Sequence, residues 1–185
     1  MNRNLRTWVV AVLVVLLAAI AVLCFFNRER WKDYRDYFRE DYVAVEMQYD
    51  KLTSATDEKA ARKLFPNVFL RCYDDSSAPR LGDRVCYSTV THVDGLPAMS
   101  VLLFFAKGKL THTMVRVPWW RHGAWRDKLV SQYGVAHKST TFAILEGPLV
   151  QWDLPGGAYI NFHRERSLNP LEWSGIFWSA GQDRK

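Results

Sequence analysis

The chain opens with an apolar segment that contains no charged residue, no proline and no glycine over positions 8–26. As a helix, this segment would be about 28 Å long, close to the ~30 Å hydrocarbon core of a bilayer. A helix that is apolar on every side needs an apolar environment, so the pattern predicts a membrane anchor. The residues expected to face lipid are Trp8, Leu13, Leu16, Leu17, Ile20, Phe25 and Phe26.

After the anchor, an apolar residue recurs at every third or fourth position. This spacing predicts that the helix continues over residues 27–52 as a juxtamembrane amphipathic helix. Its apolar seam either packs on the protein's own sheet or joins two copies in a short coiled coil, because heptad spacing is kept over three repeats. The seam residues are Trp31, Tyr34, Phe38, Tyr42, Val45, Tyr49 and Leu52.

The remaining chain combines two helical segments with short stretches of strand-like composition. The expected helices cover residues 56–65 and 118–133. The expected strands cover residues 68–73, 85–92, 98–106, 109–117, 140–145, 149–154, 158–163 and 171–179. This order predicts an α+β fold with a mainly antiparallel sheet, arranged as two halves that each hold one helix and four strands.

The order of segments also predicts the domain organisation. The apolar run lacks a small-x-small cleavage site, and Leu23 precedes Cys24 where a lipoprotein signal needs a small residue. We therefore expect an uncleaved anchor. Lysines and arginines are more numerous after the anchor than before it, but long domains translocate largely regardless of charge. The expected parts are a cytoplasmic tail (1–7), the anchor (8–26), the juxtamembrane helix (27–52), an extracytoplasmic domain (53–180) and a tail (181–185).

Two cysteines bear on the cellular compartment. Cys72 and Cys86 flank a polar loop, and a disulfide between them would stabilise the fold by ~3 kcal/mol; the alternative is a pair of unrelated thiols. A disulfide requires an oxidising compartment. The sequence contains no Asn-x-Ser/Thr glycosylation site. Together these features favour a single-pass protein of the bacterial inner membrane with its large domain in the periplasm.

Composition narrows the possible partners. The net charge is +6, but the basic residues are interleaved with acidic ones rather than gathered on one stripe. This pattern argues against a nucleic-acid-binding protein. A moderately basic face suits a protein that lies near anionic lipid head groups. The lipid bilayer is therefore one expected partner.

The second half of the chain carries a family resemblance. The helix that contains Trp125 and ends near Gly134 is followed by a strand with Trp152 and a strand with Phe162. This layout resembles small bacterial envelope domains of the β-lactamase-inhibitor-protein type and of the small lipoprotein in the outer-membrane assembly machinery. It departs from their pattern at Ala136, where they have proline. The resemblance implies an α+β module that binds other envelope proteins and has no catalytic role.

One cluster of aromatic and basic residues is a candidate binding surface. Tryptophan and arginine are the residue types that dominate interface hot spots. The cluster therefore predicts a patch that binds a partner protein or the membrane surface; the alternative is that its tryptophans cover the sheet edge. The candidate residues are Trp119, Trp120, Arg121 and Arg126.

No stretch of the sequence carries a catalytic signature. The alternative function, a membrane-tethered hydrolase, would use the loop acids Asp74, Asp75 and Asp83 or a cluster of histidines. The five histidines, which show no local metal-binding spacing, are His92, His112, His122, His137 and His163. We therefore expect no catalytic residue, no metal site and no cofactor. The leading hypothesis is a membrane-anchored envelope protein whose periplasmic domain binds an unidentified protein as a scaffold or accessory subunit.

Overall fold

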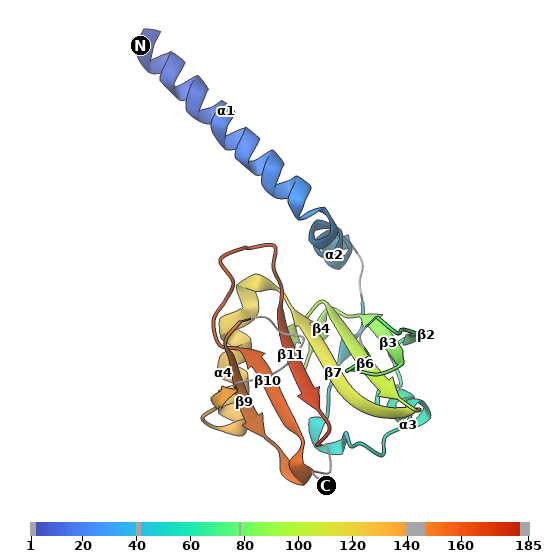
Figure 1. Ribbon diagram of the computed structural model, residues 1–185. Helices are drawn as coiled ribbons and strands as arrows, with labels where there is room; N and C mark the ends of the chain where they lie inside the picture. The colour runs from blue at the N-terminus through green and yellow to red at the C-terminus, as the bar shows by residue number, and fades with distance from the viewer. Residues whose placement is uncertain (1–2, 40–41, 78, 140–146, 182–185) are drawn as a thin grey trace.

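The computed structural model describes residues 3–39, 42–77, 79–139 and 147–181. Two N-terminal helices precede the sheet domain: α1 (Arg3–Phe26) and α2 (Arg28–Arg39). Figure 1 shows α1 projecting away from the domain, while α2 lies at the lower end of α1, just above the domain, and is seen nearly end-on. Residues Arg6–Phe26 are long and apolar enough to cross a membrane, and no part of their most apolar window is buried.

The predicted single helix over residues 27–52 is wrong for the described residues 42–52. The chain instead forms the short strand β1 (Ala44–Val45) and the 3-10 turn η1 (Tyr49–Lys51). In this segment Val45, Met47 and Tyr49 are buried at every second position, which is the period of extended chain rather than of a helix. A three-repeat coiled coil through residues 31–52 is therefore excluded in this fold.

The seam residues consequently divide into two groups. Val45, Tyr49 and Leu52 are buried in the domain's own core. Tyr42 lies half-buried between α2 and β1, and its carbonyl oxygen accepts a hydrogen bond from the Thr91 hydroxyl. The seam residues of α2 are Trp31, Tyr34 and Phe38, of which only Tyr34 is buried.

Eight strands form one antiparallel sheet in the order β2-β3-β6-β7-β11-β10-β9-β8. A second, three-stranded sheet consists of β1, β4 (His92–Val93) and β5 (Leu96–Pro97). The strands of the large sheet are β2 (Arg71–Asp74), β3 (Arg84–Thr89), β6 (Ser100–Ala106), β7 (Lys109–Val117), β8 (His137–Ser139), β9 (Leu149–Asp153), β10 (Tyr159–His163) and β11 (Ser174–Ser179).

The large sheet consists of two four-stranded meanders that join where β7 pairs with β11. The first meander follows helix α3 (Glu58–Leu64), and the second follows η2 (Trp119–Arg121) and helix α4 (His122–Tyr133). The predicted α+β fold, with a helix and four strands in each half, is confirmed. Two expected segments lie outside the described residues: the strand at 140–145 and most of the tail at 181–185. The strand β8 forms just before residue 140.

The main hydrophobic core fills the space between one sheet face and the helices. It contains Trp125 and Leu129 from α4, which the four-residue spacing of apolar positions predicts. Trp178 and Phe162 meet them from β11 and β10. A smaller cluster on the other sheet face includes Leu102, Phe104, Met114 and Phe177. The sheet is therefore buried on both faces near its centre.

The predicted disulfide is confirmed. Cys72 in β2 lies directly opposite Cys86 in β3, and their sulfur atoms are bonded. The bond joins the edge strand to its neighbour and closes the polar loop between them. Cys24 in α1 is a free thiol.

Candidate functional site

The candidate site is the junction between α2 and the connection from β7 to α4, and Trp120 lies at its centre. The Trp120 ring stacks on Phe38 with a centroid separation of 5.7 Å and an interplanar angle of 13°. The Tyr34 ring lies 5.4 Å from the same indole. Two aromatic residues of α2 therefore contact one tryptophan of the domain.

Polar contacts hold α2 to the domain along one helix face. The main-chain N–H of Trp119 donates a hydrogen bond to the Tyr34 hydroxyl at 3.2 Å. Because Tyr34 is also buried, its pKa lies above the usual value. Three residues in and just before α2 make contacts with the domain and fall at helical spacing: Asn27, Arg30 and Tyr34. Asn169 donates to Asn27 at 3.0 Å, and Arg30 pairs with Glu172 at 3.1 Å.

A second stripe of α2, beside the bound face, is aromatic and exposed. Trp31 and Phe38 are 53% and 69% exposed. Between the stripe and the domain lies a groove of about 220 Å³ whose walls are almost entirely apolar. Its lining residues are Trp31, Tyr34, Arg35, Phe38, Trp120, Pro170 and Leu171.

The four residues of the predicted binding patch lie in different environments. The Trp119 indole N–H donates to the Ser167 carbonyl oxygen at 2.6 Å, and the Arg166 guanidinium lies 3.9 Å above its ring. Trp120 is 44% exposed and contacts α2. Arg121 and Arg126 are exposed. The two tryptophans thus join α2 and the 164–173 connection to the domain, and the arginines remain at the surface.

Sequence reasoning did not find the contact between α2 and Trp120. The available signal was the pair of exposed aromatic side chains in α2, which the seam interpretation assigned to a continuous helix. Once that helix ends at Arg39, Phe38 no longer belongs to a long seam. Its ring instead packs on a tryptophan that lies more than eighty positions later in the chain, a pairing that no local pattern encodes.

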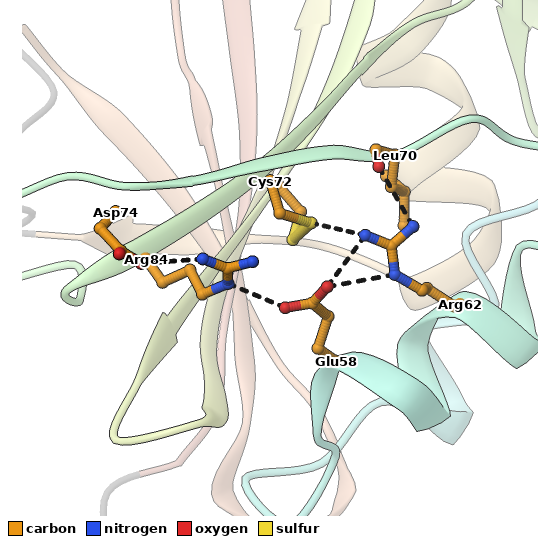
Figure 2. A network of polar contacts seen from close by, with 7 residues as sticks. Glu58, Arg62, Leu70, Cys72, Asp74 and Arg84 are labelled. Carbon is orange, nitrogen blue, oxygen red and sulfur yellow. Dashed lines mark hydrogen bonds and ion pairs between the residues drawn. A yellow bond between two sulfur atoms is a disulfide. The ribbon is translucent and has the colours of Figure 1, made fainter.

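A network of polar contacts surrounds Glu58 (Figure 2). One Glu58 carboxylate oxygen accepts hydrogen bonds from Arg62 at 2.9 and 3.1 Å, and the other accepts from Arg84 at 2.8 Å. These hydrogen bonds, led by the one from Arg84, hold the Glu58 pKa below its usual value. Arg84 also pairs with Asp74 at 2.8 Å, so the network fastens α3 to β2 and β3.

The same network contains a group of potential metal ligands. Glu58 and the sulfur atoms of Cys72 and Cys86 lie within 4.8 Å of one another. Both sulfur atoms belong to the disulfide, so neither is available as the thiolate that a metal ion would need. The group therefore serves to hold the sheet edge, and Arg62 donates to the Cys72 sulfur at 3.0 Å.

The acids that a hydrolase would require are engaged in structural contacts. Asp74 pairs with Arg84, and Asp75 accepts a hydrogen bond from the main-chain N–H of Ser77 at 2.8 Å. Asp83 accepts from the main-chain N–H of Lys107 at 3.1 Å. Asp75 and Asp83 thus accept main-chain hydrogen bonds of turns, whereas Asp74 is ion-paired at the end of β2.

The histidines are likewise dispersed. His122 is buried against the Phe162 ring, and its Nε2 donates to the His163 carbonyl oxygen at 2.9 Å. His112 is half-buried beside the Leu81 carbonyl oxygen, and His92 and His137 lie at the surface. Within the described ranges, the group of three or more metal-ligating side chains found around Glu58 contains no histidine.

The outer edge of the sheet offers a second surface. β2 is an edge strand, and Phe69 and Tyr73 beside and within it are 75% and 52% exposed. The Arg71 guanidinium lies 5.8 Å from the Phe69 ring.

The chain matches no protein-family model, and no curated protein or solved structure matches it either. Its function is therefore inferred from these surfaces.

Proposed function

We propose that this protein is a single-pass protein of the bacterial inner membrane whose periplasmic domain binds another envelope protein as a scaffold or accessory subunit, without catalysis. The observation that carries the proposal is the exposure of α1. The most apolar part of this helix has no buried residue, and the helix projects away from the sheet (Figure 1). Such an exposed apolar surface is stable in a bilayer but not in water.

The disulfide supports the periplasmic orientation. Cys72 and Cys86 are bonded across adjacent strands, and such bonds persist in oxidising compartments. Their oxidation state in cells tests the orientation directly. Maleimide labelling of the denatured full chain, with and without reductant, should show two protected thiols in addition to the reactive Cys24. Full labelling of all three cysteines without reductant would place the domain in the cytoplasm.

The β2 edge is the surface that we assign to the partner protein. An edge strand presents unpaired main-chain N–H and C=O groups to which an extended segment can add. Arg71 and Tyr73 share the face of β2 opposite Cys72, and the Phe69 ring lies just before the strand, beside the Arg71 guanidinium. Aromatic and arginine side chains of this kind anchor protein interfaces. Trp119 and Trp120 are less suitable anchors because they contact α2 and the 164–173 connection.

Site-specific photo-crosslinking tests this assignment. A photoreactive residue at Tyr73 of the full chain, produced in its native cells, should form a discrete crosslinked product with another protein. The matched control is Val135, which is 94% exposed on the connection between α4 and β8, at the opposite edge of the sheet from β2. The double variant Phe69→Ser, Arg71→Ser should abolish the product while the disulfide still forms. Equal crosslinking at both positions, or none at Tyr73, would contradict the assigned surface.

A further inference from the structure

The aromatic stripe of α2 is placed where a membrane surface would lie, if α1 spans the bilayer as proposed above. Only Asn27 separates Phe26, the end of α1, from Arg28, the start of α2. The head-group zone extends about 5 to 8 Å beyond each side of the hydrocarbon core. Figure 1 shows α2 crossing the direction of α1, so α2 runs along this zone rather than through it.

The arrangement of side chains around α2 is that of an interfacial helix. One face is bound to the domain through Arg30, Asp33 and Tyr34. The next face carries the exposed aromatic residues Trp31 and Phe38. Tryptophan is enriched at membrane interfaces, and apolar side chains of interfacial helices insert to the boundary of head groups and acyl chains.

Charge complements this aromatic face. Arg28, Lys32 and Arg35 are exposed and follow the stripe on the side away from the domain. Asp33 pairs with Arg116 of the domain at 3.5 Å, whereas Asp36 pairs with its neighbour Arg35 at 3.4 Å, so the excess positive charge of this side comes from Arg28 and Lys32. A helix with aromatic residues flanked by basic ones is suited to a bilayer that contains anionic lipid. The apolar groove behind the stripe, of about 220 Å³, opens beside the same residues.

From these observations we propose that Trp31, Phe38 and Trp120, together with the basic residues Arg28, Lys32 and Arg35, form a docking surface for an anionic phospholipid bilayer. We call this set the lipid-facing patch. The inference rests on the proposed membrane anchoring and adds a second contact to it. The patch holds the domain down on the bilayer at a fixed orientation, so that α1 is not a flexible tether.

A second copy of this chain is the competing occupant, and the geometry disfavours it. In a two-fold symmetric dimer the same patch faces itself, so the basic residues of both copies would be brought together. Stable interfaces bury on the order of 1,000 Å² or more. A helix of 12 residues with one aromatic stripe offers much less. A bilayer does not bring a second set of basic residues against the patch, and its binding does not depend on a large protein–protein interface.

Nitroxide labels on the full chain in nanodiscs test the proposal. The labels are introduced singly as Trp31→Cys, Phe38→Cys, Leu16→Cys and Val135→Cys, each combined with Cys24→Ala. The measured quantity is the ratio of collision rates with oxygen and with a water-soluble nickel chelate, which rises with depth in the membrane. Discs contain phosphatidylcholine, with or without phosphatidylglycerol.

The expected result is a high ratio at residue 16, an intermediate ratio at residues 31 and 38, and a low ratio at residue 135. Phosphatidylglycerol should raise the ratio at residues 31 and 38 several-fold over residue 135. Reversing charge by Lys32→Glu with Arg35→Glu should cancel that rise and leave residue 16 unchanged. In the charge-reversed protein, an unchanged spectrum of the label at residue 135 verifies that the domain is folded, because it reports the mobility of the connection after α4.

Three results would overturn the inference. A deep residue 16 with water-like values at residues 31 and 38 would leave the anchor intact and remove the lipid-facing patch. Dipolar broadening between labels at residue 38 that persists at low protein-to-disc ratio would assign the patch to a second copy. A water-like residue 16 would instead contradict the proposed membrane anchoring itself.

Discussion

The Tyr34 hydroxyl accepts a hydrogen bond from the main-chain N–H of Trp119 at 3.2 Å, across 85 positions of the chain. Tyr34 is buried in this contact, and its ring lies beside Trp120. The contact therefore joins α2 to the segment that connects the two halves of the sheet. The position of the domain relative to α1 depends on it.

Removing this hydroxyl should loosen α2 without unfolding the domain. Tyr34→Phe keeps the ring contact with Trp120 but leaves the Trp119 N–H without its acceptor, at a cost of about 1 kcal/mol. Hydrogen exchange of the full chain in nanodiscs should show faster exchange in α2 and unchanged protection in β6 and β7. Tyr37→Phe is the matched control in the same helix. Equal exchange in both variants would show that the bond does not hold α2.

A second prediction concerns Asp94, in the turn between β4 and β5. Its carboxylate accepts a hydrogen bond from the main-chain N–H of the fully buried Met47 at 2.8 Å. Asp94→Ala leaves this N–H unpaired and should cost about 1–3 kcal/mol of stability. Asp94→Asn keeps an acceptor and tolerates the left-handed backbone at this position (φ 48°). Urea denaturation of the full chain in detergent micelles distinguishes the two.

The pH dependence of the Asp94 variants follows from the same burial. Burial raises the Asp94 pKa above its usual value of 3.8. An acid whose pKa is raised by folding binds its proton more tightly in the folded state, so stability falls as pH rises from 3.8 through the raised pKa. Asp94→Asn should remove this loss and be at least as stable as the parent at neutral pH. A less stable Asp94→Asn protein would contradict the assignment.

A third prediction concerns the pair of Glu58 and Arg84. Folding lowers the Glu58 pKa from 4.5, so its contribution to stability is present above pH 4.5 and is lost as pH falls through the lowered pKa. Because both side chains are about one-third exposed, Arg84→Gln should cost only about 0.5–1 kcal/mol at neutral pH. The cost should vanish in acid. Carboxyl NMR titration should show the Glu58 pKa rising in this variant.

Asp74 provides the control for the Glu58 network. Its side chain is 85% exposed although it pairs with the same arginine. Asp74→Asn should therefore change stability by no more than a few tenths of a kcal/mol. A large effect from Asp74→Asn, with a small one from Arg84→Gln, would reverse the relative importance of the two contacts.

The disulfide gives the fourth prediction. Its cysteines are separated by 14 positions, and in the chain-entropy model a bond that closes such a loop contributes about 3 kcal/mol. Cys72→Ala with Cys86→Ala should lower the free energy of unfolding by about 2–4 kcal/mol. Cys24→Ala should leave the domain's stability unchanged. Guanidinium denaturation in micelles, followed by tryptophan fluorescence, measures both.

His122 carries the fifth prediction. Burial lowers its pKa below 6.5, so the folded state favours the neutral ring. Stability is therefore complete above pH 6.5 and falls as pH drops below that value, because the unfolded chain binds the proton more readily. His122→Gln retains a donor for the His163 carbonyl oxygen and should abolish this slope. His122→Phe keeps the ring against Phe162 but loses the donor, and should cost about 1–3 kcal/mol at neutral pH, a difference that shrinks in acid as the parent loses stability.

The local pattern of apolar and polar residues was sufficient to predict strands that follow one another through tight turns. The strand at Lys109–Val117 forms over the predicted residues, because Lys107 and Gly108 adopt the left-handed backbone of a two-residue hairpin. The apolar helix α1 and the helix that carries Trp125 and Leu129 were also predictable from local pattern. The helical periodicity or length of each apolar segment is visible within the segment itself.

Prediction failed where one set of residues fits two periods. Val45 and Tyr49 are four positions apart and fit a helix, but Val45, Met47 and Tyr49 also alternate as in a strand. The pairing of β1 with β4 decides the outcome, since Val45 lies opposite Val93 in a parallel bridge. The contact of Phe38 with Trp120 has the same origin. Both depend on residues that are distant in sequence.

The junction of β7 with β11 has a consequence for the order in which the chain is completed. Val117 lies opposite Ser174, so the two meanders cannot be joined until almost the whole chain is available. The strands that carry Cys72 and Cys86 are sequence neighbours, and β3 pairs next with β6. In the export that we propose, the first meander can pair and oxidise before the second is available. The core is complete only when the last strand, β11, inserts Trp178.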